Sequence, residues 1–182
     1  MNYNKGVMSG HSHWKQIQHK KGANDQKRGQ IFSKLLRAIS IAAKTEPNPQ
    51  FNPRLRTAVE TAKENKVPLE NIERAISKAS EEKNLEDIVV EAYGPEGSAL
   101  IIEAVSDNTN RTINEIKGVL NEQGAKFASP GSVLWAFEKK DSGWQGKFPQ
   151  SVSDNAKEKI QNLISALENL DDVQSVYTNI GH

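Results

Sequence analysis

The spacing of apolar residues changes from a helical to a strand period near residue 84, and this change constrains the fold more than any other feature. Before it, apolar side chains such as Ile31, Leu35 and Ile39 recur every three or four residues, as in an amphipathic helix. After it, two β-branched runs, 88–93 and 98–105, flank a Gly-Pro-Glu-Gly turn, which is typical of a hairpin. The predicted fold class is α+β, with an N-terminal helical domain followed by a two-layer α+β domain that has a mostly antiparallel sheet.

Three helices are predicted between residues 25 and 83. The first covers about 25–44, and the prolines of TEPNPQFNPRLR end it because each restricts its own φ and the residue before it. Asn52 and Pro53 suit the start of the second helix, and Pro68 opens the third. One side of the first helix should pack, and the opposite side is predicted to be a positively charged face of Lys27, Lys34, Arg37 and Lys44.

Residues 84–182 predict an open sheet with helices on one face. After the hairpin, Asp107 or Asn108 caps a helix that Gly124 closes, and residues 132–139 form a third strand. A final helix, capped by Ser153 or Asp154, and a last strand over 173–180 complete the order ββαβαβ. On the third strand, Trp135 and Phe137 alternate on one face, so we expect them in the core rather than in a stacking platform.

The charge is divided unevenly between the two parts. The chain carries a formal net charge of only +1, but residues 1–83 hold 16 Lys and Arg against 8 Asp and Glu, and the remainder holds 8 against 15. Residues 1–56 are the most basic, with 11 basic side chains against Asp25 and Glu46. Such asymmetry indicates a polyanionic partner, although a solvated basic surface without a specific partner is an open alternative.

Two segments are candidates for binding this partner. Residues 1–24 are predicted to be a basic arm. Together with the start of the first helix, the arm can neutralise phosphates and stack an aromatic ring on a base. The candidate residues are His11, His13, Trp14, Lys15, His19, Lys20, Lys21, Lys27 and Arg28. A disordered basic tail is the alternative. The second segment, SDNTNRT, could hold an anion with Asn108, Arg111 and backbone N–H groups, or could be an ordinary helix cap with Arg111 solvated.

Several classes of function are disfavoured by what the sequence lacks. The chain has no cysteine, which excludes disulfides, thiolate zinc sites and cysteine nucleophiles. The histidines of the arm match no common zinc spacing, so no metal and no cofactor are expected. No phosphate loop, nucleophile elbow or carboxylate pair is visible, and we expect no enzyme and no small-molecule substrate. No apolar run is long enough to span a membrane and no secretory signal is visible, so a cytoplasmic location is expected.

The segments GHSHWKQIQHKKGANDQKRGQIFSKLLR and NPRLRTAVETAKENKVPLENIERAI closely resemble the N-terminal domain of the YebC family. The resemblance continues through EAYGPEG, SDNTNRT, GSVLWAFEKK and LDDVQSVYTNI. It implies a probable transcriptional regulatory protein that binds DNA, or else an RNA- and ribosome-associated translation factor like the mitochondrial translational activator of cytochrome oxidase. The nucleic-acid-binding set then extends along the basic helical domain to Lys34, Arg37, Arg54 and Arg56.

The chain departs from the family in one place. The resemblance implies two α+β domains, the last inserted within the second, but here residues 141–152 alone separate the third strand from the final helix. We expect this segment to be a short surface connection that replaces the inserted domain. We also expect Met8 to be a sufficient start, because family-like sequence begins there and residues 1–7 show no period.

Overall fold

The computed structural model describes residues 25–79, 84–140 and 143–181. Three helices come first, α2 (Asp25–Ala43), α3 (Pro53–Glu64) and α4 (Leu69–Lys78). They are followed by β1 (Glu86–Tyr93), η1 (Pro95–Gly97), β2 (Ala99–Ser106), α5 (Thr109–Glu122), β3 (Lys126–Ala128), η2 (Leu134–Ala136), β4 (Phe137–Lys140), β5 (Gly143–Gly146), α6 (Asp154–Glu168) and β6 (Val173–Thr178). The predicted α+β class is therefore confirmed.

The three N-terminal helices pack on a core of their own. Ile39, Leu55 and Ile72 are almost fully buried at its centre. The Asn52 side chain begins α3 by accepting a hydrogen bond from the Leu55 N–H at 3.0 Å, and it also donates to the carbonyl oxygens of Ala42 and Glu46. One buried amide thus caps α3 and fixes the turn that leads into it.

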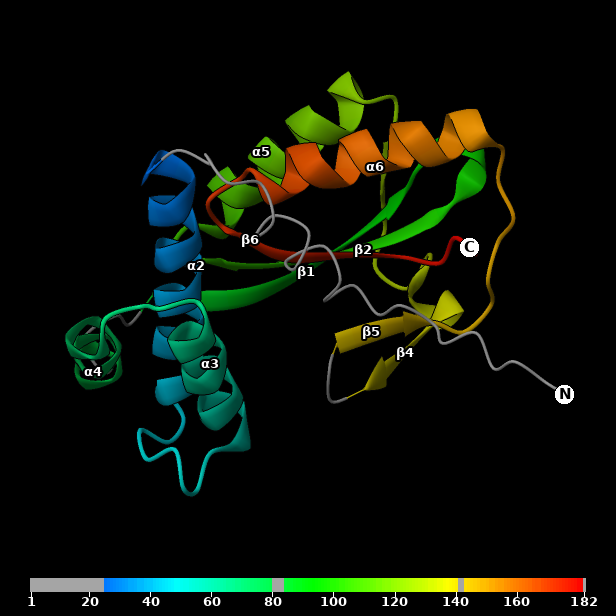
Figure 1. The fold of residues 1–182 in the computed structure, drawn as a ribbon. Helices are drawn as coiled ribbons and strands as arrows, with labels where there is room; N and C mark the ends of the chain where they lie inside the picture. The colour runs from blue at the N-terminus through cyan, green and yellow to red at the C-terminus, as the bar shows by residue number, and fades with distance from the viewer. Residues whose placement is uncertain (1–24, 80–83, 141–142, 182) are drawn as a thin grey trace, which may run out of the picture.

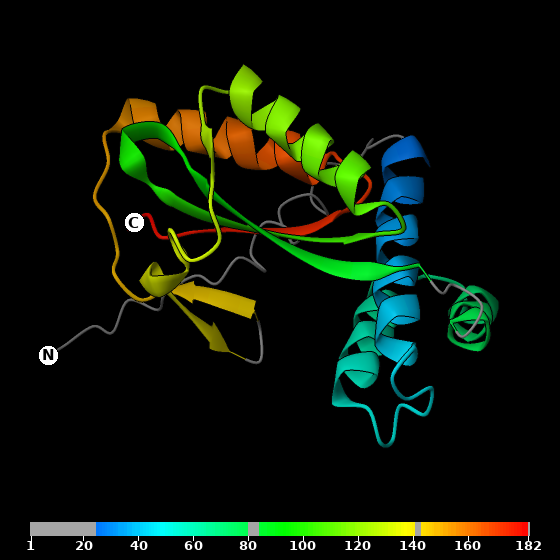
Figure 2. The ribbon, with the colours of Figure 1, turned by 180° about the vertical axis from the view of Figure 1, so that it is seen from behind.

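The main sheet is antiparallel, with the strand order β3-β1-β2-β6. The predicted hairpin is present as β1 and β2, and the last strand pairs with β2. Figures 1 and 2 show α5 and α6 side by side over one face of this sheet. Their contact with the strands buries the largest cluster of apolar side chains, which includes Leu100, Ile102, Ile116 and Leu163.

A second, two-stranded sheet of β4 and β5 packs against part of the opposite face of the main sheet (Figure 1). Phe137 and Tyr177 are buried between the two sheets. Gly143, the first residue of β5, lies directly against Tyr177 of β6: a Cβ atom at this position would come within 2.4 Å of the Tyr177 hydroxyl oxygen. Its φ of +116° also favours glycine. Residues 143–146, which lie in the segment expected to be a surface connection, thus form a packed strand.

The predicted third strand over 132–139 is wrong in part. The third strand of the main sheet is β3, whereas residues 134–136 form a 3₁₀ turn and only Phe137–Lys140 is a strand, in the smaller sheet. The cause is the buried carboxylate of Glu91, which accepts hydrogen bonds from the N–H groups of Gly131, Val133 and Leu134. The turn leaves Phe137 buried, as expected, but leaves Trp135 65% exposed, so the expectation that Trp135 lies in the core is also wrong.

Candidate nucleic-acid interface

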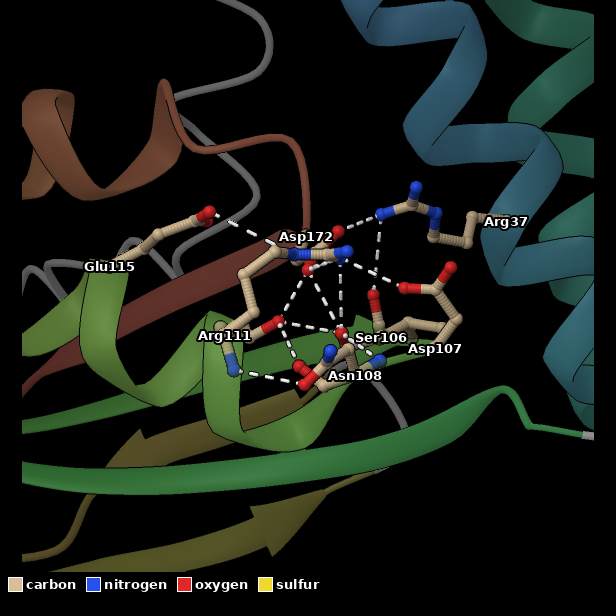
Figure 3. Close-up of polar contacts among 9 residues, drawn as sticks. Arg37, Ser106, Asp107, Asn108, Arg111, Glu115 and Asp172 are labelled. Carbon is tan, nitrogen blue, oxygen red and sulfur yellow. Dashed lines mark hydrogen bonds and ion pairs between the residues drawn. The ribbon is translucent and has the colours of Figure 1, made fainter.

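A network of charged side chains joins α2 to the α+β part at the start of α5 (Figure 3). Asn108 caps α5 by accepting a hydrogen bond from the Arg111 N–H at 3.1 Å. The Arg111 guanidinium lies 2.9 Å from the Asp107 carboxylate and 2.8 Å from that of Asp172, with Glu115 at 3.8 Å. Arg111 is thus held by carboxylates, and an anion at this point would have to compete with them.

Asp172 is the centre of this network. Its carboxylate, only 4% exposed, accepts hydrogen bonds from Ser106, Thr112 and Arg111, and Arg37 of α2 contacts its second oxygen. Burial alone would raise the pKa of Asp172, but the hydrogen bonds and the charge of Arg37 outweigh burial and lower it to about 2. A buried carboxylate is tolerated when cations and donors surround it in this way.

The cationic side of α2 faces the α+β part over much of its length. Lys34 is buried and its ammonium donates to the Glu168 carbonyl oxygen. Burial lowers the pKa of Lys34 to about 8, and the charges of Glu168 and Asp171 oppose this only in part. Lys44 donates to the Leu85 carbonyl oxygen at 2.8 Å. The predicted positively charged face of this helix is therefore wrong at Lys34 and Arg37, since a sequence does not show which neighbour will cover a helix.

Arg54 and Arg56, at the start of α3, also have partners within the chain. Arg54 makes two hydrogen bonds, of 2.7 and 2.6 Å, to the Asp87 carboxylate of β1. Arg56 donates to the carbonyl oxygens of Pro49 and Gln50 at 3.2 and 3.1 Å. Both side chains are largely solvent-exposed. An exposed ion pair such as that of Arg54 and Asp87 contributes little to the free energy of folding.

An open cleft of about 680 Å³ lies between α2, α4 and the start of β1. Ser33 and Arg37 line it from α2, and Asn71, Arg74 and Lys78 line it from α4. Arg74 makes an exposed ion pair with Glu70 one turn earlier, at 2.6 Å. The acidic side chain in the lining is Asp107, which Arg111 neutralises. The cleft therefore presents cations and amides, which are groups that bind phosphate oxygens.

The predicted arm residues His11, His13, Trp14, Lys15, His19, Lys20 and Lys21 lie outside the described residues. Lys27 and Arg28 are exposed on the first turn of α2, and the Arg28 guanidinium lies 5.2 Å from the centre of the Phe32 ring. Sequence reasoning missed Arg74, Lys78 and Asp172. The four-residue spacing of Glu70, Arg74 and Lys78 along one predicted helix was a usable signal, whereas nothing local marks Asp172.

Within the described residues, no group of His, Cys, Asp and Glu is arranged to hold a metal ion. No described helix is long and apolar enough to cross a membrane.

The fold and the site define a two-part α+β protein in which a basic helical part is fixed by ion pairs to one end of an antiparallel sheet. Residues 12–82 match the model of the TACO1/YebC protein N-terminal domain, and residues 85–142 match the model of the TACO1/YebC second and third domain. The chain belongs to the TACO1/YebC family.

Relatives of known sequence and structure agree with this placement. A "probable transcriptional regulatory protein" of Aquifex aeolicus is 47% identical over 137 residues, which are 73% of this chain and 55% of the relative. A protein of the same description from Methylacidiphilum infernorum is 49% identical over the same length. The chain thus spans about half the length of these relatives. The crystal structure of the conserved hypothetical protein Aq1575 from Aquifex aeolicus superposes with a TM-score of 0.81 at 31% identity, covering 93% of this chain and 96% of that one.

Proposed function

We propose that this protein is a nucleic-acid-binding regulator of gene expression that acts in the cytoplasm and binds DNA through its basic N-terminal part. Relatives that share nearly half of its residues over the aligned region are named probable transcriptional regulatory proteins. The concentration of 11 basic against two acidic residues in positions 1–56 supports a polyanionic partner for this part of the chain.

The observation that carries the proposal is the cleft between α2 and α4. Arg74 and Lys78 line it and are exposed, and both come from the helical part rather than from the acidic half. Lys27 and Arg28 lie on the first turn of α2, next in sequence to the basic arm. In the proposed mode, phosphates occupy the cleft and the arm residues from His11 to Lys21 extend the contact along the backbone. Phosphate contacts position the protein without reading sequence.

A second candidate function is that of an RNA- and ribosome-associated translation factor. Phosphate chemistry alone does not separate RNA from DNA. The observation that favours RNA is the pair of exposed aromatic rings of Trp135 and Phe148 outside the helical part, because RNA recognition commonly stacks unpaired bases on such rings.

The cleft is tested by neutralising its two exposed cations. In the double variant Arg74→Gln, Lys78→Gln, duplex DNA binding should weaken, and the slope of log affinity against log salt should decrease in magnitude by about 2, because two phosphate contacts are lost. The matched control is Lys157→Gln, Lys159→Gln, which removes two exposed charges from α6. Equal losses in both variants would mean that binding follows net charge and would contradict a site in the cleft.

Cosedimentation with ribosomes separates the two candidate functions. A DNA regulator should remain in the supernatant of a cleared lysate, whereas a translation factor should pellet with ribosomes and be released by ribonuclease. The cleft double variant should lose whichever association the native chain shows.

A further inference from the structure

Three exposed aromatic side chains gather at the edge of the smaller sheet. Tyr93 ends β1, Trp135 lies in η2 and Phe148 follows β5, and they are 40%, 65% and 52% exposed. They come from segments that are far apart in sequence, yet they are connected through Ser132 and through direct ring contact. We call this group the aromatic platform.

The rings of the platform are held in place although they are exposed. The Tyr93 hydroxyl and the Trp135 indole N–H both donate to the Ser132 carbonyl oxygen, at 3.1 and 2.9 Å. The centres of the Trp135 and Phe148 rings are 5.8 Å apart, with the ring planes tilted by 41°. Rings fixed before binding lose little conformational entropy when a ligand stacks on them.

The segment that contains Ser132 is held in place by the buried side chain of Glu91. Glu91 is only 6% exposed, and its carboxylate accepts hydrogen bonds from the backbone N–H groups of Gly131, Val133 and Leu134, which flank Ser132 in the sequence. Packing requirements do not explain why Trp135 points outward from this anchored turn, because Phe137, two residues later, fills the core between the sheets. A large exposed ring on a rigid turn is a feature of binding surfaces.

Two lysines lie beside the platform. The Lys147 ammonium lies 5.5 Å from the centre of the Phe148 ring, and Lys126 is the cross-strand neighbour of Tyr93. The carboxylates of three nearby segments have partners within the chain: Glu91 accepts three backbone hydrogen bonds, Glu96 accepts from the N–H and hydroxyl of Ser153, and Glu138 pairs with Lys140 at 2.9 Å. Free lysines next to exposed rings match the phosphates and bases of an unpaired strand.

We infer that the aromatic platform stacks the bases of single-stranded nucleic acid, with Lys126 and Lys147 contacting its phosphates. In a duplex the faces of the bases are stacked on one another, whereas in an unpaired RNA or DNA strand they are accessible to aromatic side chains. The platform is distinct from the cleft between α2 and α4, since the two share no residue and lie in different parts of the fold. The inference deepens the second candidate function, because the Trp135 and Phe148 rings that favour RNA belong to the platform, and it does not depend on the cleft.

The test measures binding of the full chain to fluorescein-labelled oligonucleotides of about twelve nucleotides: oligo-U, oligo-dT and a mixed-sequence DNA duplex. The double variant Trp135→Ala, Phe148→Ala should bind oligo-U about tenfold more weakly and the duplex with unchanged affinity. Phe51→Ala is the matched control, because Phe51 is 75% exposed in the helical part, and it should leave both affinities unchanged. Oligo-dT shows whether the platform distinguishes RNA from DNA.

A second measurement keeps both platform rings. In the variant Trp14→Phe, Trp144→Phe, Trp135 is the only remaining tryptophan, and stacking should quench its fluorescence as oligo-U saturates the protein. The variant Lys147→Gln should weaken oligo-U binding and lower its salt dependence without altering the fold.

The outcomes separate the platform from the cleft. Unchanged oligo-U affinity in the double variant, together with unquenched Trp135 fluorescence, would overturn the platform while leaving the cleft intact. Loss of duplex binding only in the variant Arg74→Gln, Lys78→Gln would support the cleft independently. Light scattering of the full chain and of the platform double variant completes the test: self-association of the native chain that the double variant loses would identify the rings as a self-association surface and overturn the inference.

Discussion

At the scale of single residues, Asp172 makes stability depend on pH. The pKa of Asp172 in the folded chain is about 2, below its ordinary value of 3.8, so the unfolded chain takes up a proton first as the pH falls. The stabilising contribution is therefore complete above about pH 4 and is lost between about pH 4 and pH 2. Asp172→Asn should cost about 2 kcal/mol at neutral pH and flatten the acid limb of urea unfolding midpoints. Asp171→Asn, an exposed neighbour, is the control, and an unchanged acid limb in Asp172→Asn would contradict this role.

Lys34 differs from Asp172 in that its charged form destabilises the fold, because burial lowers its pKa. Its pKa is lowered from 10.5 to about 8, so between these values the folded chain has released a proton that the unfolded chain keeps. Stability should therefore rise from about pH 8 to pH 10, by an amount on the order of 2 kcal/mol. Lys34→Met should remove this rise, whereas Lys27→Met on the exposed first turn of the same helix should keep it. Chemical unfolding at two pH values measures both, and a persisting rise in Lys34→Met would refute the assignment.

At the scale of elements, Glu91 of β1 determines the conformation of residues 131–134. Replacing it by Gln leaves the shape but removes the charge that receives three backbone N–H groups. Hydrogen bonds to charged groups are the stronger ones, so Glu91→Gln should destabilise the fold by about 2 to 3 kcal/mol. Hydrogen exchange should quicken at Val133 and Leu134 first. Glu138→Gln, on the exposed strand β4, should change neither quantity, and equal effects of the two substitutions would argue against an anchor.

The same elements show how far sequence patterns reach. Periodicity located α2, α3, α4, the β1–β2 hairpin and α6, because each has a strong apolar stripe or alternation that local physics dictates. The run 132–139 has the composition of a strand, but a turn forms there because Glu91, about forty residues earlier, provides acceptors for its N–H groups. The charged face of α2 was misjudged for a related reason: Asp172 and Glu168 lie more than 130 residues away in sequence. Long-range partners of this kind leave no local signal.

At the scale of the whole molecule, the two parts are joined through polar groups more than through apolar ones. Arg37 contacts Asp172, Arg54 pairs with Asp87, and a small apolar contact of Ile41, Leu85 and Val105 lies between them. The basic part thus meets the acidic part at its boundary. Lys34 and Arg37 are used there, and the exposed cations of the described helical part lie on the first turn of α2 and just after this helix, at both ends of α3, and on the cleft side of α4.

The α+β part should fold as one unit across residues 141–152. The strand β6 pairs with β2 along Leu100–Ala104, and α6 buries Ile160, Leu163 and Leu167 on the sheet. A chain that ends at Lys140 loses β5, α6 and β6 together. It would expose the edge of β2 and the apolar side chains that these elements cover, and an open sheet with a bare face and a free edge aggregates.

We therefore expect the chain truncated after Lys140 to be insoluble or to lack a cooperative thermal transition, while the full chain unfolds in one step for this part. The alternative is that residues 85–140 form an autonomous ββαβ unit with a dispensable final helix. A fragment 85–140 that is soluble, melts sharply and gives dispersed amide NMR signals would establish that alternative. The substitution Leu163→Ala in the full chain gives a milder test, because a cavity beneath α6 should cost about 2 to 5 kcal/mol and, if the part is one unit, should lower the unfolding midpoint reported by β1 and β2 by the same amount as that reported by α6.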